Sequence, residues 1–251
     1  MKAEWIIDEK VLEKIREVIR SNENKPRVRE RREDNIEKKD INLSKDNIWK
    51  AFVGCEITSQ QKSGENSLVE LFLGSNNDVL IYDKCKSLKQ EEISEQLSKN
   101  RLRFNRRIPN FLIKIINNLE NGEWNVLLDK LEELKNNPCK DKEIEVADYL
   151  CEKKIKNEKV YKGIGLKQSR NFLQQLGLSK YEIPIDSREI KVLKECGVNF
   201  IPGANGLQDR TTYMFLEQGL QKICEILSIE PCILDACFFA NFEKDNSTKE
   251  K

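Results

Sequence analysis

Apolar residues recur with the period of an α-helix along most of this sequence. In residues 108–119 they occupy positions i, i+3, i+4, i+7, i+8 and i+11, which places them on one helical face (Ile108, Phe111, Leu112, Ile115, Ile116 and Leu119). Helix-breaking residues are scarce, with 11 glycines and 6 prolines among 251 residues. Residues 79–82 are the one strand-like run, and they are too few to define a sheet. The pattern predicts an all-α fold of roughly ten helices with short connections.

Length and charge narrow the kinds of protein that fit this sequence. At 251 residues the chain is long enough for one large domain or two small ones. Its 44 basic and 43 acidic residues nearly cancel, which disfavours a protein that coats a polyanion by charge alone. Residues 21–42 carry many charges of both signs, which predicts a solvated loop or an exposed helix. No apolar run approaches the ~18 residues of a membrane span, so none is expected.

The chain contains no histidine, which excludes every mechanism that needs an imidazole. A general base or nucleophile must then be a carboxylate, lysine, tyrosine or cysteine. Eight cysteines are present, but no pair has the CxxC spacing of common zinc or iron–sulfur sites. We therefore expect reduced, buried thiols in a cytoplasmic protein, with neither a metal nor another cofactor.

The segment that ends at Gly177 carries the strongest functional pattern. Seven basic and two acidic residues lie between positions 151 and 170, and Gly163-Ile164-Gly165 predicts a tight turn between two helices. Lys167 lies at the start of the second helix. Glycines let the backbone approach a partner closely, and unpaired amides at a helix start suit a phosphate. An ordinary helix–turn–helix connection explains the same residues without any ligand.

A second candidate position is Asp186, which follows the extended run Ile183-Pro184-Ile185. Asp186 and Glu189 form a D-x-x-E capping box, so Asp186 is a good helix N-cap whatever else it does. Lys167 has an equally plain alternative role as an exposed surface lysine. Composition alone therefore leaves both residues with a structural and a chemical interpretation.

At this point the sequence resembles a known family. Gly163-Ile164-Gly165-x-Lys167, followed nineteen residues after the lysine by Asp186, resembles the helix-hairpin-helix DNA glycosylases of base-excision repair. The resemblance is greatest to the bifunctional 8-oxoguanine DNA glycosylase/AP lyases. Two further segments are similar: residues 49–61, a buried helix with a polar end, and residues 228–239, which resemble the last helix of compact members. That last helix has Cys-Phe-Phe where such members usually have Leu-Trp.

The resemblance implies a fold and a set of functional residues. It implies two helical subdomains with a cleft between them: a barrel of residues 46–180, and a second subdomain of residues 1–45 and 181–251. It implies a monomer that acts on damaged double-stranded DNA in the nucleoid and excises 8-oxoguanine. The implied roles are catalysis for Lys167 and Asp186, DNA contact for Gly163, Gly165, Gln60, Gln61 and Arg170, and a base pocket lined by Phe238, Phe239 and Asp235.

The chemistry places one demand on the nucleophile. An attacking amine must be neutral, whereas a free lysine is charged at neutral pH. A helix N-terminus stabilises the neutral form only weakly, so desolvation must contribute most. We therefore expect Lys167 in a groove that DNA closes, not on an open surface.

Two alternatives to the bifunctional enzyme stay open at this point. One is a monofunctional glycosylase of the same fold for alkylated or mismatched bases, in which water attacks and Lys167 touches only phosphate. The other is a non-enzymatic DNA-binding module. Borohydride trapping on abasic DNA separates the first interpretation from these two, and base release separates the monofunctional enzyme from the binding module.

Overall fold

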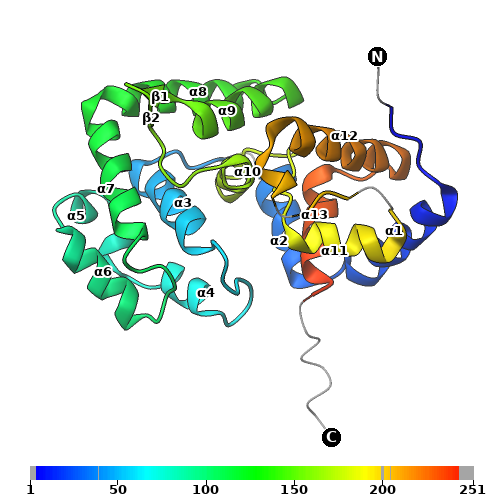
Figure 1. Ribbon diagram of the computed structural model, residues 1–251, viewed down its shortest axis with the longest axis horizontal. Coiled ribbons are helices and arrows are strands. Elements are labelled where there is room, and N and C mark those ends of the chain that lie inside the picture. The colour runs from blue at the N-terminus through cyan, green and yellow to red at the C-terminus, as the bar shows by residue number, and fades with distance from the viewer. Residues whose placement is uncertain (1–3, 39, 199–200, 204, 243–251) are drawn as a thin grey trace, which may run out of the picture. The chain divides into compact units, whose positions relative to one another are not determined.

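The computed structural model describes residues 4–38, 40–198, 201–203 and 205–242. Within these ranges the chain forms thirteen α-helices, four short 3₁₀- or π-helical segments and one two-stranded hairpin (Figure 1). It divides into two compact units, Met1–Lys39 with Ser179–Lys251, and Asp40–Leu178. The sequence placed these divisions at residues 46 and 180. The all-α architecture expected from the helical periodicity is confirmed.

The unit Asp40–Leu178 is built around α3 (Lys45–Ile57). Residues 51–57 of this helix are buried without interruption, as expected for a helix that is apolar on most sides. The other elements of this unit are α4 (Leu68–Leu73), η2 (Asp78–Leu80), α5 (Tyr82–Cys85), α6 (Gln90–Lys99), α7 (Ile108–Asn118), η3 (Leu119–Glu123), α8 (Trp124–Asn136), α9 (Lys140–Glu152), β1 (Lys154–Ile155), β2 (Glu158–Lys159) and α10 (Leu166–Gln175). Helix α10 packs against both α3 and α9.

The strand-like run at residues 79–82 does not form a strand. This run forms the helical turn η2 and the start of α5 instead. Asn77 accepts a hydrogen bond from the Val79 amide at 3.0 Å, and Asp46 accepts one from the Tyr82 amide at 2.9 Å. Because side chains take these amides, they are not available for a strand ladder. The only strands in the described residues are β1 and β2, which pair antiparallel.

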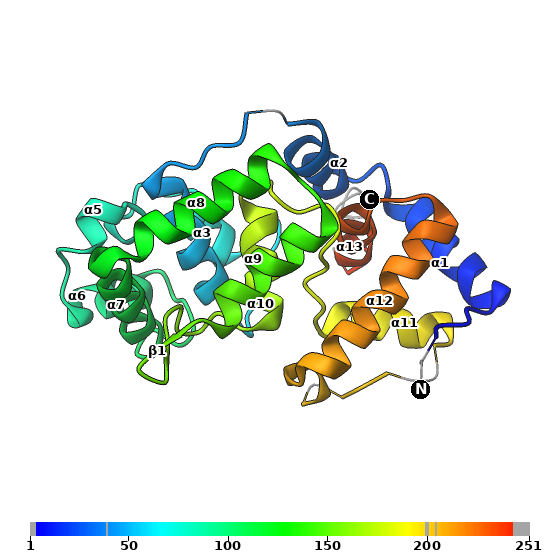
Figure 2. The same ribbon diagram turned by 90° about the horizontal axis from the view of Figure 1, so that it is seen from above.

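The unit Met1–Lys39 with Ser179–Lys251 is built around α13 (Pro231–Ala240). Figure 2 shows this helix among its neighbours α1, α2, α11 and α12, all of which contact it. The elements are α1 (Glu9–Asn22), α2 (Pro26–Arg32), η1 (Glu33–Glu37), α11 (Ser187–Cys196), η4 (Gly206–Gln208), α12 (Arg210–Leu227) and α13. Nine of the ten residues of α13 are buried, so its central position follows from its apolar composition.

The charged segment 21–42, expected as a solvated loop or an exposed helix, contains a helix that packs against its unit. It contains α2, which packs against α13, and its single fully buried apolar residue, Val28, joins the cluster around Cys232 and Ala236. Ile36 covers the same cluster. Val28 of α2 and Ile36 of η1 therefore pack on the same cluster, and these contacts dock a segment that is otherwise rich in charged residues.

Seven of the eight cysteines are buried free thiols, as expected, whereas Cys139 is exposed. No helix within the described ranges combines the length and apolarity needed to cross a membrane.

Candidate functional site

The residues Gly163, Ile164 and Gly165, here called the glycine turn, connect β2 to α10. The turn was expected to join two helices directly, but the hairpin β1–β2 lies between α9 and the turn. Ile164 is buried and anchors the turn to the core of its unit. Gly165 is the N-cap of α10 and provides no side chain to cap the first amides of the helix. These amides are the kind of group that binds a phosphate.

The two glycine positions of the turn differ in whether the structure requires glycine there. Gly163 has φ +91°, and a Cβ at this position would overlap the carboxyl group of Glu56. Gly165 has φ −109°, and a Cβ there would meet nothing within 4 Å. Packing therefore requires glycine at position 163 only. Gly165 leaves the start of α10 open to a partner.

Lys167 lies in the first turn of α10 and is half-buried. Its positive charge acts on the thiol of Cys55, a buried residue of α3. Cys55 Sγ donates a hydrogen bond to the Gln168 carbonyl oxygen (3.4 Å) and accepts one from Gln175 Nε2 (3.5 Å). Burial raises the pKa of Cys55 well above its usual range, so the thiol is neutral. Lys167 thus lies close to the buried, neutral thiol of Cys55.

Arg170, expected to contact DNA, is not available for that role. It is completely buried, and its Nη1 donates a hydrogen bond to the Leu166 carbonyl oxygen at 3.1 Å. It lies three positions before Leu173 on the buried face of α10, which carries it into the protein rather than toward solvent.

The two glutamines at the end of α3 are in different environments. Gln61 is half-buried: its Nε2 donates to the Ile57 carbonyl oxygen and its Oε1 accepts from the Arg103 amide at 3.0 Å. Gln60 is exposed and has φ +53°, and its carbonyl oxygen accepts from Arg103 Nη1 at 2.7 Å. Both the nitrogen and the oxygen of the Gln61 side-chain amide make hydrogen bonds within the protein. Gln60 is therefore the glutamine whose side chain is exposed to solvent.

Residues 101–107, here called the arginine loop, were missed by the sequence reasoning. The loop contains four exposed arginines and no acidic residue: Arg101, Arg103, Arg106 and Arg107. Phe104 lies among them with φ +58°, and the Arg107 guanidinium carbon stands 4.3 Å from the centre of its ring. Arg103 binds the backbone of Gln60, so the loop adjoins the polar end of α3. The signal was a basic run interleaved with an aromatic residue, a pattern typical of nucleic-acid contact.

Asp186 lies in the other unit, at the N-cap of α11. Its carboxylate accepts from the Arg188 amide at 2.7 Å, and the Asp186 amide donates to Glu189 at 2.6 Å, so the expected capping box is confirmed. The Arg188 guanidinium also donates two hydrogen bonds to the Asp186 carboxylate, at 3.1 and 2.6 Å. Burial, together with the charges of Asp186 and Asp235, raises the pKa of Glu189. The carboxylate of Asp186 is therefore held firmly in one orientation.

The base-pocket candidates on α13 are separated by their burial. Phe238 is 1% exposed and belongs to the core, which corrects its expected role in stacking on a base. Phe239 is half-buried, and the guanidinium carbons of Arg27 and Arg188 lie 4.5 and 4.0 Å from its ring centre. Asp235 is buried, with Arg31 Nη2 4.0 Å from its carboxylate. Phe239 is thus the less buried of the two phenylalanines of α13, with two arginines over its ring.

Comparison with known proteins bears on the fold. No protein-family model matches the chain, and no curated protein sequence does. The 8-oxoguanine glycosylase/lyase of Methanocaldococcus jannaschii, solved with a 15-mer DNA containing 8-oxoguanine, matches with a TM-score of 0.65 at 20% identity, covering 91% of this chain and 95% of that one. This chain has the fold of an 8-oxoguanine DNA glycosylase. A second structure of the enzyme from that organism matches with a TM-score of 0.62 at 21% identity, covering 91% and 92% of the two chains.

The glycosylase fold extends over nearly the whole chain. The 8-oxoguanine DNA glycosylase of Thermotoga maritima matches with a TM-score of 0.60 at 17% identity, covering 94% of this chain and 98% of that one. The helical fold implied by the resemblance of the glycine turn is therefore confirmed across both units, far beyond the segments that carried the resemblance.

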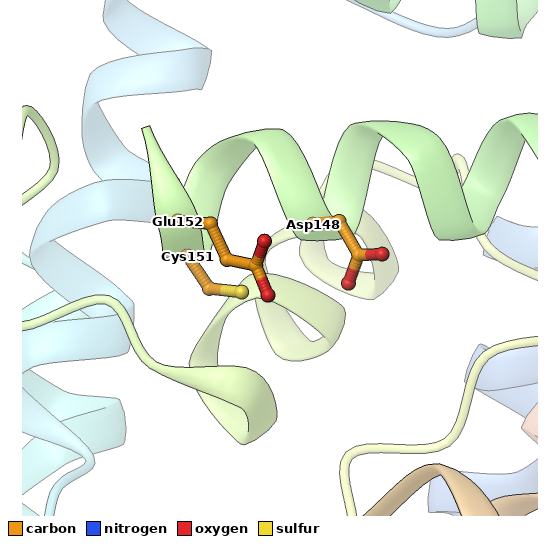
Figure 3. A group of neighbouring side chains, drawn as sticks. All are labelled: Asp148, Cys151 and Glu152. Atoms are coloured by element: carbon orange, nitrogen blue, oxygen red, sulfur yellow. The ribbon is translucent and has the colours of Figure 1, made fainter. Parts of the chain in front are cut away.

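The described part of this glycosylase fold contains one group of potential metal ligands. Asp148, Cys151 and Glu152 of α9 have ligand atoms within 4.8 Å of one another (Figure 3). Burial raises the pKa of Cys151 to about 11, so its thiol stays protonated at neutral pH, whereas metal binding requires the thiolate. The charge of the buried Arg170 acts on the same thiol and disfavours a second cation there. We assign no metal to this group.

Proposed function

We propose that this protein is a DNA glycosylase with AP lyase activity that removes 8-oxoguanine from double-stranded DNA. One observation carries the proposal: a chain with the glycosylase fold has a half-buried lysine in the first turn of a helix whose N-cap, Gly165, is open. This arrangement suits an amine nucleophile beside a bound phosphate. The protein would act as a monomer on nucleoid DNA in the cytoplasm.

The proposed reaction runs through Lys167. Its neutral Nζ forms a bond to C1′ of the damaged nucleotide while the N-glycosidic bond breaks, and the base leaves with the bonding electrons. The nitrogen then loses a proton, the C1′–O4′ bond breaks and O4′ takes up that proton, which opens the sugar ring and leaves a protonated Schiff base. Removal of a C2′ proton then expels the 3′ phosphate. Asp186 would stabilise the positive charge that develops on the sugar. The two arginines beside Phe239 would help that ring hold an extruded base.

DNA contact is proposed for three neighbouring features of the unit Asp40–Leu178. The glycine turn would bind a phosphate through its amides, and the arginine loop would neutralise further phosphates. Gln60, whose backbone is bound by Arg103, would occupy the gap left by the extruded nucleotide. Support comes from the exposure of Gln60 and the loop arginines, and from the open position of Gly165.

Replacing Gln60 tests the gap-filling role. Gln60→Ala is expected to weaken binding to duplex containing an abasic-site analogue, with thermal stability unchanged within about 0.5 kcal/mol because the side chain is exposed. Gln61→Ala, the matched comparison, removes two hydrogen bonds and is expected to cost about 1–3 kcal/mol of unfolding free energy. Anisotropy titrations and thermal melts measure the two effects. Equal DNA affinity of Gln60→Ala and the unmodified protein would remove Gln60 from the proposal.

Replacing Gly165 tests the phosphate contact. Gly165→Arg is expected to lower the affinity for lesion DNA several-fold and to make its salt dependence shallower, because a bulky side chain keeps the phosphate from the amides. The fold should tolerate this change, since position 165 is open and has negative φ. Gly165→Ala is the control and should bind nearly normally. An unchanged salt slope in Gly165→Arg would assign the turn a purely structural role.

The whole proposal is tested with damaged duplexes and borohydride. Oligonucleotides containing 8-oxoguanine, uracil or 3-methyladenine are incubated with the protein, and base release, strand cleavage and covalent trapping are measured. We expect preferential trapping and cleavage with 8-oxoguanine. Base release without trapping would instead support the monofunctional enzyme, and binding without release would support the DNA-binding module.

A further inference from the structure

A buried carboxyl group lies directly beneath the glycine turn. Glu56, in the last turn of α3, is 4% exposed, and its carboxyl fills the space that a side chain at position 163 would need. Contact with Gly163 explains why a glycine with φ +91° is required at that point. Glu56 is thus part of the support on which the turn rests, although it belongs to a helix more than a hundred residues away in the sequence.

The carboxyl group is poorly satisfied by the protein around it. Within the described part of the chain, Glu56 Oε1 is shielded from solvent and makes no hydrogen bond. The carboxyl also lies at the C-terminal end of α3, where the helix dipole disfavours a negative charge. Each of these features opposes ionisation. Burial raises the pKa of Glu56 to about 8, with Arg107 opposing the shift, so the neutral form predominates at pH 7.

The charged groups around Glu56 do not change this conclusion. Arg107, the N-cap of α7, is the described charged group that acts on Glu56. Cys55 of α3 is a neutral thiol, and Lys167 of α10 acts on that thiol. The other described titratable groups on elements packed against α3 are not among the causes of the shift: Glu70 of α4, Asp78 of η2, Tyr82, Asp83, Lys84 and Cys85 of α5, Lys114 of α7 and Arg170 of α10.

We propose that Glu56 is a positioning residue for DNA binding: its neutral carboxyl supports the glycine turn, and a phosphate docks there only while Glu56 is uncharged. The proposal rests on the proposed function, because it takes the docking phosphate from DNA. An ionised Glu56 would place a negative charge beneath the amides that receive the phosphate, and like charges at one site repel. Binding of DNA above the pKa of Glu56 therefore requires uptake of a proton.

The expected pH dependence follows from linkage. Below pH 8 Glu56 is already protonated in the free protein, so affinity does not depend on it. As pH rises through 8 the free protein loses this proton, and the affinity for DNA falls by about tenfold between pH 7 and pH 9. Glu56→Gln keeps the shape of the side chain and cannot ionise, so this loss should be absent from the variant.

The experiment measures the dissociation constant of a duplex containing a tetrahydrofuran abasic-site analogue from pH 6.5 to 9.5 at constant ionic strength. The unmodified protein is compared with Glu56→Gln, with Glu56→Met as a second uncharged variant should Gln not fold, and with Glu65→Gln, which removes an exposed carboxylate. The ratio of the constants for unmodified protein and Glu56→Gln should rise about tenfold between pH 7 and 9, because other titrating groups cancel in it. Glu65→Gln should follow the unmodified protein.

Two outcomes overturn the proposal in distinguishable ways. If the protein binds and is trapped on lesion DNA at pH 7, but the curves of unmodified protein and Glu56→Gln stay parallel to pH 9.5, Glu56 has no part in phosphate docking while the proposed function stands. If the unmodified protein binds the duplex at no pH, the proposed function fails and the role of Glu56 fails with it. Thermal melts at each pH confirm that the compared proteins are folded.

Discussion

Lys167→Gln is expected to abolish borohydride trapping and cleavage of DNA containing 8-oxoguanine. An amide nitrogen is not nucleophilic and forms no Schiff base, so the loss should reach several orders of magnitude, as when a nucleophile is removed from other enzymes. The fold should be unaffected, because Lys167 is only half-buried and a glutamine side chain is nearly as long as that of lysine. Single-turnover cleavage and trapping on preformed abasic DNA measure the effect.

Lys162→Gln is the matched control for this experiment. Lys162 precedes the glycine turn and is exposed, so the variant removes the same charge from the same segment without touching α10. It should be trapped normally, with at most a modest loss of affinity from one weakened phosphate contact. Normal trapping of Lys167→Gln would show that Lys167 is not the nucleophile. An equal loss in both variants would show that Lys167 contributes charge and not chemistry.

Asp186→Asn is expected to lose most base excision while it melts close to the unmodified protein. Asparagine is about as good an N-cap as aspartate, so the contact with the Arg188 amide is kept. The pair with the Arg188 guanidinium is weakened, but the nearby buried Glu189 loses a like-charged neighbour, and the two changes oppose each other. What disappears is the negative charge proposed to stabilise the sugar cation. Cleavage of preformed abasic sites should persist through Lys167.

A second N-cap aspartate gives the control for Asp186. Asp209 caps α12 in the same unit by accepting a hydrogen bond from the Thr212 amide at 2.8 Å. In Asp209→Asn the asparagine still caps α12, and we expect this variant to excise the damaged base normally. Asp186→Ala measures the structural role of the residue, because loss of the helix cap should lower the free energy of unfolding by about 0.5–2 kcal/mol. Full excision by Asp186→Asn would leave this residue a helix cap alone.

The parts of this protein that the sequence determined are local. The period of residues 108–119 predicted α7, and Asp186-x-x-Glu189 predicted the capping box that begins α11. Both depend on contacts between residues within about one helical turn, so spacing alone specifies them. The glycine turn and Lys167 were recognisable for the same reason: their relation to one another is set by the few residues between them.

The tertiary structure decided which of the candidate side chains are available to a ligand. Arg170 is basic, yet its helix turns it into the core, and Phe238 and Phe239 are neighbours of which only the second is accessible. The choice between Gln60 and Gln61 depends on Arg103, more than forty residues away. No spacing rule encodes such contacts, because they arise only when separate helices pack.

Glu56 is the clearest example of a residue whose role the sequence does not reveal. In the sequence Glu56 is one acidic residue near the end of a helix whose last turns are otherwise apolar. In the fold it lies beneath Gly163, and its buried Oε1 makes no hydrogen bond among the residues that the structure describes. Its environment, and hence its protonation, depends on the packing of the glycine turn against α3 and not on its sequence neighbours. The sequence by itself thus determined the helices and the residues that could do chemistry, and the packing between helices determined their burial and charge.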